Sequence, residues 1–403
     1  MRNSCSAGRC MSLDFPSLLP QVDGLGRSAA ERAAELSARL PHAFQALGAA
    51  ARVPREELGR LLARAGSRWP GAFPSAEPID GVFACPPHPE RLNIFAADGS
   101  QVYPDRHGLT LFYLINIGSI HIAHGSGDPP EVSSTPRLLY EESDLYGEDE
   151  GLMPSALIDG QRDAAELAEL AHRSEARPEG PSLAILDNGL LLWLALQMKD
   201  SHRPEVTRIL GDYLEQLGRL KSAGTAVAGF VDRPRNANVL ALLHLASLSP
   251  DEVNEDSLHV KPWRGLTDRA IFARLLRPGE RSARFEHASP VNERFRAAGH
   301  AVEFFYLCCG EDQIARIEVP AWVGADPALM AIVHSGIIQQ CRTPGGFPYA
   351  LVRAHELAVV SSEDRQALEE MLAEALLRHG LPALPSQKAL TKQWTGARRR
   401  HRL

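Results

Sequence analysis

The sequence NIFAADGSQVYPDRHGLTLFYLINIGSIHIAHG, residues 93–125, decides the fold class. Its two apolar segments, 93–100 and 109–125, are rich in β-branched and aromatic residues and predict neighbouring strands. Within the first segment the apolar run stops at Asp98, and the sequence Asp-Gly-Ser at this point is typical of a turn. A second polar group of Asp105, Arg106 and His107 follows. The stretch is therefore either a turn between two strands or part of an acidic catalytic centre.

Strands and helices alternate on the C-terminal side of this stretch. Residues 125–136, GSGDPPEVSSTP, predict a loop because they are rich in Gly, Pro and Ser. Residues 153–171 have the apolar spacing of a helix, and residues 181–193, PSLAILDNGLLLW, predict a buried strand that runs into Asp187. A later antiparallel hairpin is expected to turn at residues 310–312. Strands separated by helices predict an α/β domain around a mixed sheet.

Three regions are expected along the chain. Residues 1–85 predict a helical arm, with a kink or break at Pro41, and residues 86–380 predict the main domain. Residues 381–403 form a basic tail that contains Trp394 and six Lys or Arg residues between Lys388 and Arg402. That tail is either an electrostatic contact for phosphates or a solvated chain end.

The composition favours a soluble cytoplasmic protein. Of 403 residues, 44% are hydrophobic and 23% are charged, which is enough apolar material for a core. The net charge of −7 means that any contact with nucleic acid must be local. The six cysteines form no CxxC pair, which argues against a zinc finger or a disulfide framework and fits a reducing compartment. The sequence contains no apolar run that predicts a membrane helix.

Carboxylates follow two of the expected strands. Asp98 and Asp187 each end an apolar segment, and the helix between them carries Glu166 and Glu169. A single Asp at such a place more often caps a turn. Carboxylates from adjacent strands, however, are the ligands that Mg²⁺ and Mn²⁺ prefer, and two such ions support phosphodiester hydrolysis. The third ligand is open between Glu166 and Glu169, because Arg162 and Glu166 also have the spacing of an ordinary ion pair.

A last cluster lies in GGFPYALVRAHELAVVS, residues 345–361. If Tyr349 precedes the helix that holds His355, the two side chains can face one cleft. The His could ligate a metal or transfer a proton, and the Tyr could position a phosphate. Packing roles are the alternative for both residues.

In order along the chain, these stretches resemble the NurA family of DNA double-strand-break repair nucleases. The segments that carry the resemblance span roughly residues 95–370: AADGSQVYPDRHG with YLINIGSI, ILDNGLLLW, FVDRPRNANVLALL, LTDRAIFARLL, ARIEVPAWV and GGFPYALVRAHELAVVS. Their order is more specific than any one of them. The family implies an RNase H-like core, so residues 86–380 are expected to be a NurA-like nuclease domain.

The resemblance also implies an activity, partners and site residues. It implies a Mn²⁺-dependent (or Mg²⁺-dependent) 5′-to-3′ exonuclease and single-strand endonuclease with two ions. It also implies a role in DNA repair, a homodimer, and docking on a hexameric HerA-type DNA-translocating ATPase. Metal ligation falls to Asp98, Glu166, Asp187 and His355, and Tyr349 completes the catalytic group. Arg233 and Arg235 are expected to contact DNA, because Asp232 stands where the family tends to carry a Lys.

The sequence also departs from the family at Asn188, where Gly is common, although the neighbouring Asp187 remains. This change and the acidic charge leave open a second hypothesis, a catalytically weak adaptor subunit of a DNA translocase ring. A third hypothesis is an ATP-binding protein of the actin and sugar-kinase type, which shares the same core. It ranks last because the sequence shows no clear pair of phosphate-binding hairpins.

Overall fold

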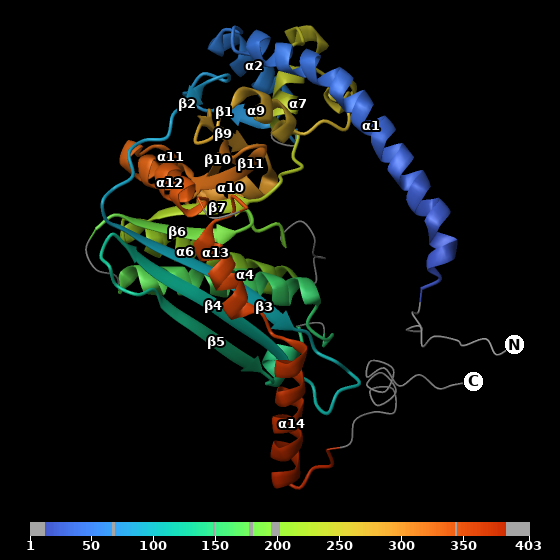
Figure 1. Ribbon diagram of the computed structural model, residues 1–403, viewed down its shortest axis with the longest axis vertical. Helices are drawn as coiled ribbons and strands as arrows, with labels where there is room; N and C mark the ends of the chain where they lie inside the picture. The colour runs from blue at the N-terminus through green and yellow to red at the C-terminus, as the bar shows by residue number, and fades with distance from the viewer. Residues whose placement is uncertain are drawn as a thin grey trace, which may run out of the picture.

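The stretch that opens the domain forms two long antiparallel strands, β3 (Leu92–Val102) and β4 (Tyr113–His124), which pair along the whole of β3. The computed structural model describes residues 13–66, 69–147, 150–176, 180–194, 202–342 and 345–383. These residues form one mixed sheet of eleven strands, with the path β1-β9-β10-β11-β7-β6-β3-β4-β5. Figure 1 shows β3 and β4 crossing the lower half of the molecule.

The half of the sheet around β3 has an RNase H-like topology. Strands β3, β4 and β5 form an antiparallel meander, then β6 and β7 add to the other side of β3 in parallel. Helices α4 and α6 make the two crossovers, as parallel pairing requires. The additional elements are β5 (Glu131–Leu139), α4 (Ser155–Glu175), β6 (Ser182–Asp187), α6 (Arg203–Ser222) and β7 (Ala226–Val231). The predicted α/β class and RNase H-like core are confirmed.

The sheet continues beyond β7 with antiparallel strands. The predicted hairpin is present, because Gly310 pairs with Gln313 across the turn between β10 and β11. The strands of this half are β1 (Ala72–Pro74), β2 (Val82–Phe83), β8 (Arg281–Ser282), β9 (Phe285–His287), β10 (Val302–Gly310) and β11 (Gln313–Pro320). β1 pairs with β9, and β2 pairs with β8. Part of the region expected to be a helical arm, residues 1–85, therefore belongs to the sheet.

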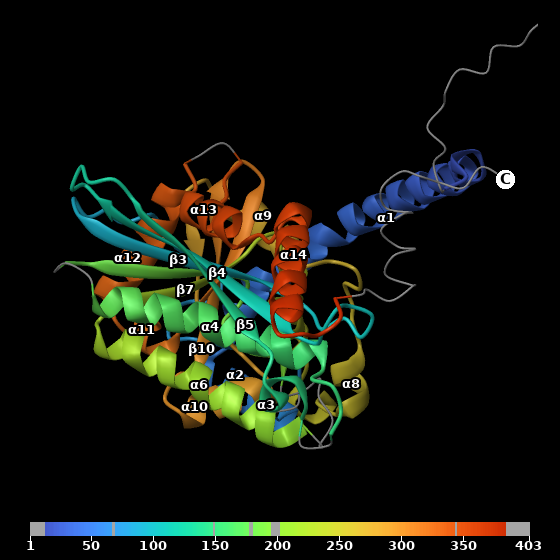
Figure 2. The same ribbon diagram turned by 90° about the horizontal axis from the view of Figure 1, so that it is seen from below.

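Two layers of helices cover the sheet. Helices α4 and α6 lie on one face, whereas α12 (Pro327–Gln340) and α13 (Tyr349–Ala358) lie on the other (Figure 2). The alternation of side chains along β3 shows the same division. Phe95 and Ala97 pack in the core cluster that contains Leu167 of α4. Ile94 packs in the cluster that contains Val333 of α12.

The N-terminal helices project from this core. α1 (Phe15–Ala50) is one helix that continues through Pro41, so the break expected there is wrong. Its last turns and α2 (Arg55–Ala65) pack with α7 (Asn238–Leu245) and α9 (Asp268–Leu275) around Leu47 and Leu61, while its first turns extend away (Figure 1). The other short elements are α3 (Glu142–Leu145), η2 (Pro250–Glu252), α8 (Glu255–His259), α10 (Pro290–Ala297), α11 (Ala321–Gly324) and α14 (Ser362–Arg378).

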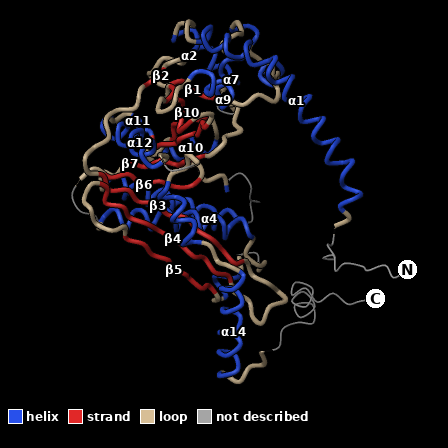
Figure 3. Tube along the Cα trace, viewed as in Figure 1, coloured by secondary structure: helices blue, strands red, loops and turns tan. Residues whose placement is uncertain are grey.

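Two local expectations are wrong. The segment expected to be a loop, 125–136, supplies the first residues of β5, and its Pro136 is tolerated because β5 is at the edge of the sheet (Figure 3). Asp98 does not end its strand, because β3 continues to Val102 and remains paired with β4. The Asp-Gly-Ser sequence is therefore not a turn here.

Two further expectations depend on the ends and the helices of the chain. Residues 384–403, most of the predicted basic tail, lie outside the described residues. Within the described ranges, the structure has no helix with both the length and the apolar character that spanning a bilayer would require.

Candidate active site

Asp98 and Asp187 lie side by side at the centre of the sheet. The parallel strands β3 and β6 pair in register from Asn93 with Ser182 to Ala97 with Leu186. Asp98 and Asp187 are the next residue on each strand, so their backbones are neighbours at roughly the 4.8 Å spacing of paired strands. The register of the sheet therefore places these two residues next to each other, as the sequence predicts.

The pairing of β3 with β6 stops at this point, while β3 remains paired with β4 on its other side. Beyond Ala97, the edge of β3 that faced β6 is open. Gly99 lies on this edge, and a Cβ at Gly99 would be 2.6 Å from Cγ of Arg162 and 2.7 Å from Oε1 of Glu166. A glycine is therefore required here because helix α4 brings its polar side chains directly against the strand backbone.

Glu166 is the helix carboxylate that faces the aspartates. Its side chain is buried, and its Oε1 lies 3.2 Å from Nε of Arg162. Glu169 has different neighbours, because it accepts hydrogen bonds from Oγ of Ser119 at 2.7 Å and from Nε of Arg173 at 2.6 Å. The geometry therefore favours Glu166 over Glu169 as the third carboxylate, and the pair of Arg162 with Glu166 is buried rather than on the surface.

His355 reaches the same place from the opposite face of the sheet. Its Nδ1 lies 2.6 Å from Oδ2 of Asp98. Helix α13 approaches β4 closely enough for this contact because residue 118, which pairs with Asp98, is a glycine. A Cβ at Gly118 would lie 2.4 Å from the carbonyl oxygen of Ala354 and 2.3 Å from the amide nitrogen of Ala358. Two glycines thus allow side chains from both helix layers to converge on Asp98.

The C-terminal end of α13 is held in place by polar side chains of the sheet. Nδ2 of Asn116 donates to the carbonyl oxygens of Leu357 at 3.2 Å and Ala358 at 2.9 Å. Oγ of Ser100 also donates to the carbonyl oxygen of Ala358. These bonds satisfy carbonyls that the end of a helix leaves without partners. They therefore fix the position of the helix turn that carries His355.

The proximity of the carboxylates shifts their acidity. Burial, followed by the charge of Asp163 and then those of Asp98 and Asp187, holds the pKa of Glu166 well above its usual range despite the opposing charge of Arg162. Burial and the charge of Asp98 also raise the pKa of Asp187, which the amide of Asn188 and the charge of His355 oppose. Raised pKa values in clustered carboxylates indicate negative charge that lacks full compensation, a common property of functional sites.

These side chains have the donor chemistry of a site for hard divalent cations. Asp98, Glu166 and Asp187 offer carboxylate oxygens, and His355 offers an imidazole nitrogen. Among the described residues, however, no group of three or more His, Cys, Asp or Glu side chains is placed to hold a metal ion as it stands. The guanidinium of Arg162 supplies positive charge to the cluster instead. The residue types fit Mn²⁺ or Mg²⁺, and a bound cation would take over that charge.

Sequence reasoning missed two acidic members of the cluster. Asp163 contacts Nη2 of Arg162 at 2.6 Å, and its burial raises its pKa, to which the charge of Asp98 contributes. Asp232, directly after β7, adds to the raised pKa of Asp187. The signal for Asp163 was its position three residues before Glu166 on the same helix, where both share a face. The signal for Asp232 was its place at the end of a strand parallel to β6.

The other predicted site residues lie further from these contacts. Tyr349 is the first residue of α13 rather than a residue before it, and it is 42% exposed. It is six positions before His355 in the same helix, so the two side chains point in directions about 120° apart around the helix axis. Arg233 and Arg235 are exposed on the segment after β7. Arg233 has a φ of 46°, and its Nε lies 3.8 Å from Oδ2 of Asp232.

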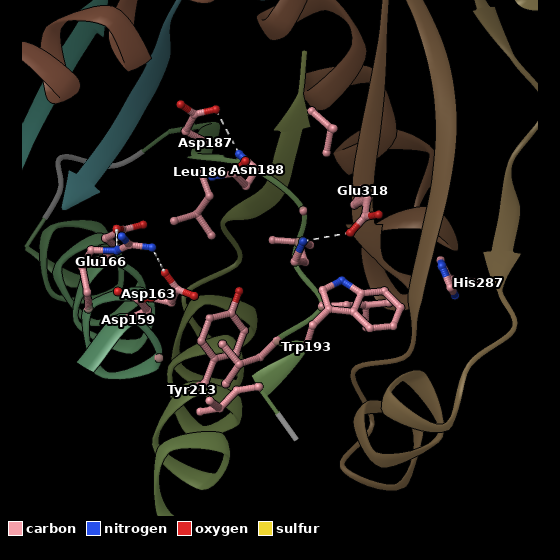
Figure 4. A pocket seen from close by; sticks show the side chains of 18 of the residues that line it. Asp159, Asp163, Glu166, Leu186, Asp187, Asn188, Trp193, Tyr213, His287 and Glu318 are labelled. Atoms are coloured by element: carbon pink, nitrogen blue, oxygen red, sulfur yellow. Dashed lines mark hydrogen bonds and ion pairs between the residues drawn. The ribbon is translucent and has the colours of Figure 1, made fainter. Parts of the chain in front are cut away.

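A pocket of about 430 Å³ opens beside the carboxylates (Figure 4). Glu166, Asp163 and Asp159 of α4 line one side, and Asp187 lies at the end of β6 between them and Glu318 of β11. Trp193 and His287 line the part next to Glu318, with ring centroids 5.2 Å apart. Asn188 has a φ of 80°, a conformation that Asn adopts more readily than most residues, so the turn after Asp187 forms without glycine.

Comparison with solved structures gives similarities of low sequence identity. The chain is 14% identical to the NurA nuclease from Sulfolobus solfataricus, over 71% of this chain and 85% of that one, with a TM-score of 0.45. It is 11% identical to a NurA crystallised with manganese, over 75% and 92%, with a TM-score of 0.41. It is 16% identical to the catalytic domain of human endonuclease V, over 79% and 95%, with a TM-score of 0.30.

Sequence comparison identifies the family. None of the curated proteins compared with this chain matches it. The family model described as the NurA domain matches residues 92–360, which is more than half of the chain and includes Asp98, Glu166, Asp187 and His355. The chain therefore belongs to the NurA domain family.

Proposed function

We propose that this protein is a metal-dependent deoxyribonuclease that hydrolyses phosphodiester bonds. The observation that carries the proposal is the convergence of Asp98, Glu166, Asp187 and His355 from two strands and two opposite helix layers. A packing role does not account for this convergence, because it places mutually repelling carboxylates in a partly buried position. Family membership supports the same reading, since relatives in the family carry the name nuclease.

In this proposal Asp98, Glu166 and Asp187 hold two Mn²⁺ or Mg²⁺ ions. Bound divalent ions would polarise the scissile phosphate and stabilise the attacking and leaving oxygens. A relative crystallised with manganese supports this class of cofactor. The protein itself orients the carboxylates, as when Oδ1 of Asp187 accepts a hydrogen bond from the amide of Asn188 at 3.0 Å, and a bound cation would favour their deprotonated forms.

The contact of His355 with Asp98 suggests that the histidine ligates a cation or transfers a proton. When Nδ1 donates to the ionised Asp98, Nε2 carries a lone pair directed away from that contact. Nε2 can then ligate a cation, or accept the proton of the attacking water and return it to the leaving oxygen. Because the His355 side chain is 65% exposed, a DNA strand can reach it.

The remaining predicted residues are proposed to bind DNA. Arg233 and Arg235 are exposed on the segment that leaves β7 beside the cluster, where they can contact phosphates. Tyr349 is exposed at the start of α13 and would contact the strand further from the scissile bond. The proposed division keeps an N-terminal region of residues 1–85, a nuclease domain of residues 86–380 and a basic tail of residues 381–403, although β1 and β2 of the first region join the sheet of the second.

The resemblance to the family extends the proposal to a cellular role. We expect 5′-to-3′ exonuclease and single-strand endonuclease activity in DNA end resection and double-strand-break repair in the cytoplasm. The partner would be a HerA-type hexameric ATPase, which a homodimer of this chain would join. These expectations rest on the family alone and need their own assays.

A catalytically weak adaptor of a translocase ring is the second candidate. The observation that favours it is Arg162, whose guanidinium contacts Glu166 and Asp163 inside the carboxylate cluster. An adaptor would retain this arrangement in the presence of metal. The substitution at Asn188 no longer favours an adaptor, because the turn there keeps its positive φ.

A metal titration on DNA separates the two candidates. Purified protein is incubated with end-labelled linear duplex and with single-stranded DNA in EDTA, Mg²⁺ or Mn²⁺, with and without a HerA-type ATPase. A nuclease degrades DNA only when a divalent ion is present. An adaptor binds the ATPase and leaves both DNA forms intact under every metal condition.

A further inference from the structure

A second pocket lies on the helical side of the molecule, and none of the residues that line it belongs to the carboxylate cluster. It has a volume of about 230 Å³ and is lined by α7 and by the segment 258–266. Trp263 and Val260 of that segment form one wall, and the buried Trp69 contributes to the lining. The pocket is therefore narrow and has aromatic surface, which suits a single planar ring.

The charge of this pocket differs from that of the catalytic pocket. Lys261 and Arg264 flank Trp263 in the sequence VKPWRGL and are exposed. The described residues that line the pocket include no carboxylate, whereas the catalytic pocket has five. In a chain with a net charge of −7, a lining with two cations and no acid is selective for an anionic ligand.

The two pockets are neighbours. Asn236 lines both of them, so they are separated only by the segment that leaves β7. That segment also carries the exposed Arg233 and Arg235. Exposed cationic side chains therefore lie next to the residue that the two pockets share.

The pocket is built on a fixed frame. Asp268 accepts hydrogen bonds from the amides of Val239 at 3.0 Å and Leu240 at 2.9 Å, so it caps α7 rather than its own helix. The side chain of Asn238 donates to the carbonyl oxygen of Pro70 at 3.1 Å. Arg39 donates to the carbonyl oxygen of Arg264 at 2.6 Å and so ties the Trp263 segment to α1. A ligand would meet a preformed site.

We infer that this pocket binds a nucleobase of single-stranded DNA by stacking on Trp263, while Lys261 and Arg264 contact the adjacent phosphates. The inference deepens the proposed function and rests on it. Aromatic platforms flanked by cations are the way in which proteins bind single strands without reading sequence. A duplex does not fit a cavity of about 230 Å³, so the site distinguishes an unpaired end from paired DNA.

The test measures binding without cleavage. In an Asp98→Asn background, fluorescence anisotropy of a labelled oligothymidylate and of a blunt hairpin duplex reports the two affinities. Trp263→Ala is expected to weaken single-strand binding by roughly 5- to 100-fold, the usual effect of removing one stacking residue. Duplex affinity should change less than about 2-fold. Trp263→Phe keeps an aromatic face and should restore most of the loss.

Two controls separate stacking from folding. Tyr140→Ala removes an aromatic side chain that is 60% exposed beside β5, at the far edge of the sheet, and should leave single-strand affinity unchanged. The melting temperature of each variant verifies that it folds. Lys261→Ala should reduce the slope of log affinity against log salt by about 0.7, as the loss of one phosphate contact to a single strand does.

The outcomes distinguish this inference from the proposed function. If the parent binds single-stranded DNA and folded Trp263→Ala binds it equally well, the stacking site is rejected and the nuclease proposal stands. If the parent binds no DNA of either form, both proposals are rejected. A selective loss for the single strand that Trp263→Phe reverses supports the site.

Discussion

His355 and Asp98 are 257 residues apart in the sequence, yet their side chains meet at 2.6 Å. The contact fixes the imidazole so that Nδ1 faces the carboxylate and Nε2 faces outward. If Nε2 transfers a proton or ligates a cation, its loss removes a catalytic contribution and not a packing one, because the side chain is 65% exposed. This residue thus offers a way to alter chemistry with little effect on the fold.

We predict that His355→Ala lowers kcat by roughly 10²- to 10⁴-fold, the range typical of a lost general acid or base. Steady-state cleavage of a fluorescent oligonucleotide measures the effect. His42→Ala, at an exposed position of α1, is the matched control and should keep wild-type kinetics. An unchanged kcat in His355→Ala would contradict the assigned role.

Glu166 provides a prediction about stability. Burial and nearby negative charge raise its pKa in the folded protein, so the folded state binds the proton more tightly than the unfolded chain. The metal-free protein must then lose stability as the pH rises above the unfolded value of about 4.5 through the raised folded value. Glu166→Gln removes this loss, because the amide carries no charge.

We therefore predict that Glu166→Gln has a higher melting temperature than wild type at pH 8 in EDTA. The difference should shrink as the pH falls below the unfolded pKa of about 4.5, where Glu166 becomes protonated in both the folded and the unfolded states. Added Mn²⁺ should raise the melting temperature of wild type more than that of the variant. Differential scanning calorimetry across this pH range provides the measurement, and a variant less stable than wild type at pH 8 would contradict the prediction.

At the residue scale, sequence reasoning proposed Asp98, Asp187 and His355 because each has a distinctive neighbourhood in the chain, and the structure brings the three residues close together. Sequence reasoning could not separate Glu166 from Glu169, since residues three apart share a helix side and only packing determines which one faces the sheet. Asp163 and the inward position of Arg162 were missed for the same reason. Tyr349 and His355 point in different directions because α13 already begins at Tyr349. The Pro-Tyr sequence did not predict that starting residue.

At the scale of elements, Gly118 is what allows α13 to lie on β4. A Cβ there would be 2.3 to 2.6 Å from backbone atoms of α13, and backbone cannot rotate away as a side chain can. The helix would have to move, and the contact of His355 with Asp98 would open. Gly118 is thus required for α13 to pack on β4, and therefore for His355 to contact Asp98.

We predict that Gly118→Ala lowers the melting temperature by several degrees, consistent with about 1–3 kcal/mol for overpacking a core. It should also reduce cleavage at temperatures where the variant is folded. Gly211→Ala is the control, because nothing lies within 4 Å of a Cβ at that helical position and alanine is the better helix former. A variant at Gly118 with wild-type melting temperature and activity would contradict the close packing.

Glu77 connects the N-terminal segment to Arg281 of β8 and to Arg284, which directly precedes β9. Its carboxylate contacts Nη2 of Arg281 at 2.9 Å and Nε of Arg284 at 3.3 Å, and all three side chains are mostly buried. Burial alone would raise the pKa of Glu77, but the hydrogen bond and charge of Arg281, with those of Arg284, lower it overall. The pair therefore stabilises the fold above the unfolded pKa of about 4.5.

We predict that Glu77→Gln destabilises the protein at pH 7 by roughly 3–5 kcal/mol, because it leaves two arginines without their shared partner. The difference in the free energy of unfolding between the variant and wild type should decrease as the pH falls through the lowered pKa of Glu77, because Glu77 itself becomes protonated there. Urea unfolding at pH 7 and pH 3.5 measures this difference. Glu56→Gln, whose partner Arg60 is on the surface, is the control and should change stability by less than about 1 kcal/mol.

Sequence patterns predicted the buried elements better than the edge elements. β3, β4 and β6 have continuous apolar runs, and the structure confirms them. β5 was missed because an edge strand tolerates the polar residues and proline that are typical of loops. The end of β3 was misplaced at Asp98, because in this chain Gly99 makes room for α4 instead of making a turn.

At the scale of the whole molecule, the sheet brings together segments from most of the chain. The carboxylates come from residues 98, 166 and 187, and the histidine comes from residue 355, so the site exists only when both helix layers are in place. The net charge of −7 predicts that any contact with nucleic acid is local, but composition does not indicate where in the fold that contact lies.

The central claim is that the cluster around Asp98 hydrolyses DNA. The most direct test compares single-turnover cleavage of linear DNA in Mn²⁺ by wild type, Asp98→Asn and Glu169→Gln, after verifying that all three fold. We predict that Asp98→Asn lowers the cleavage rate by at least about 10³-fold, because it removes a metal ligand. Glu169→Gln should cleave at a rate within about 3-fold of wild type. Full cleavage by Asp98→Asn would contradict the account.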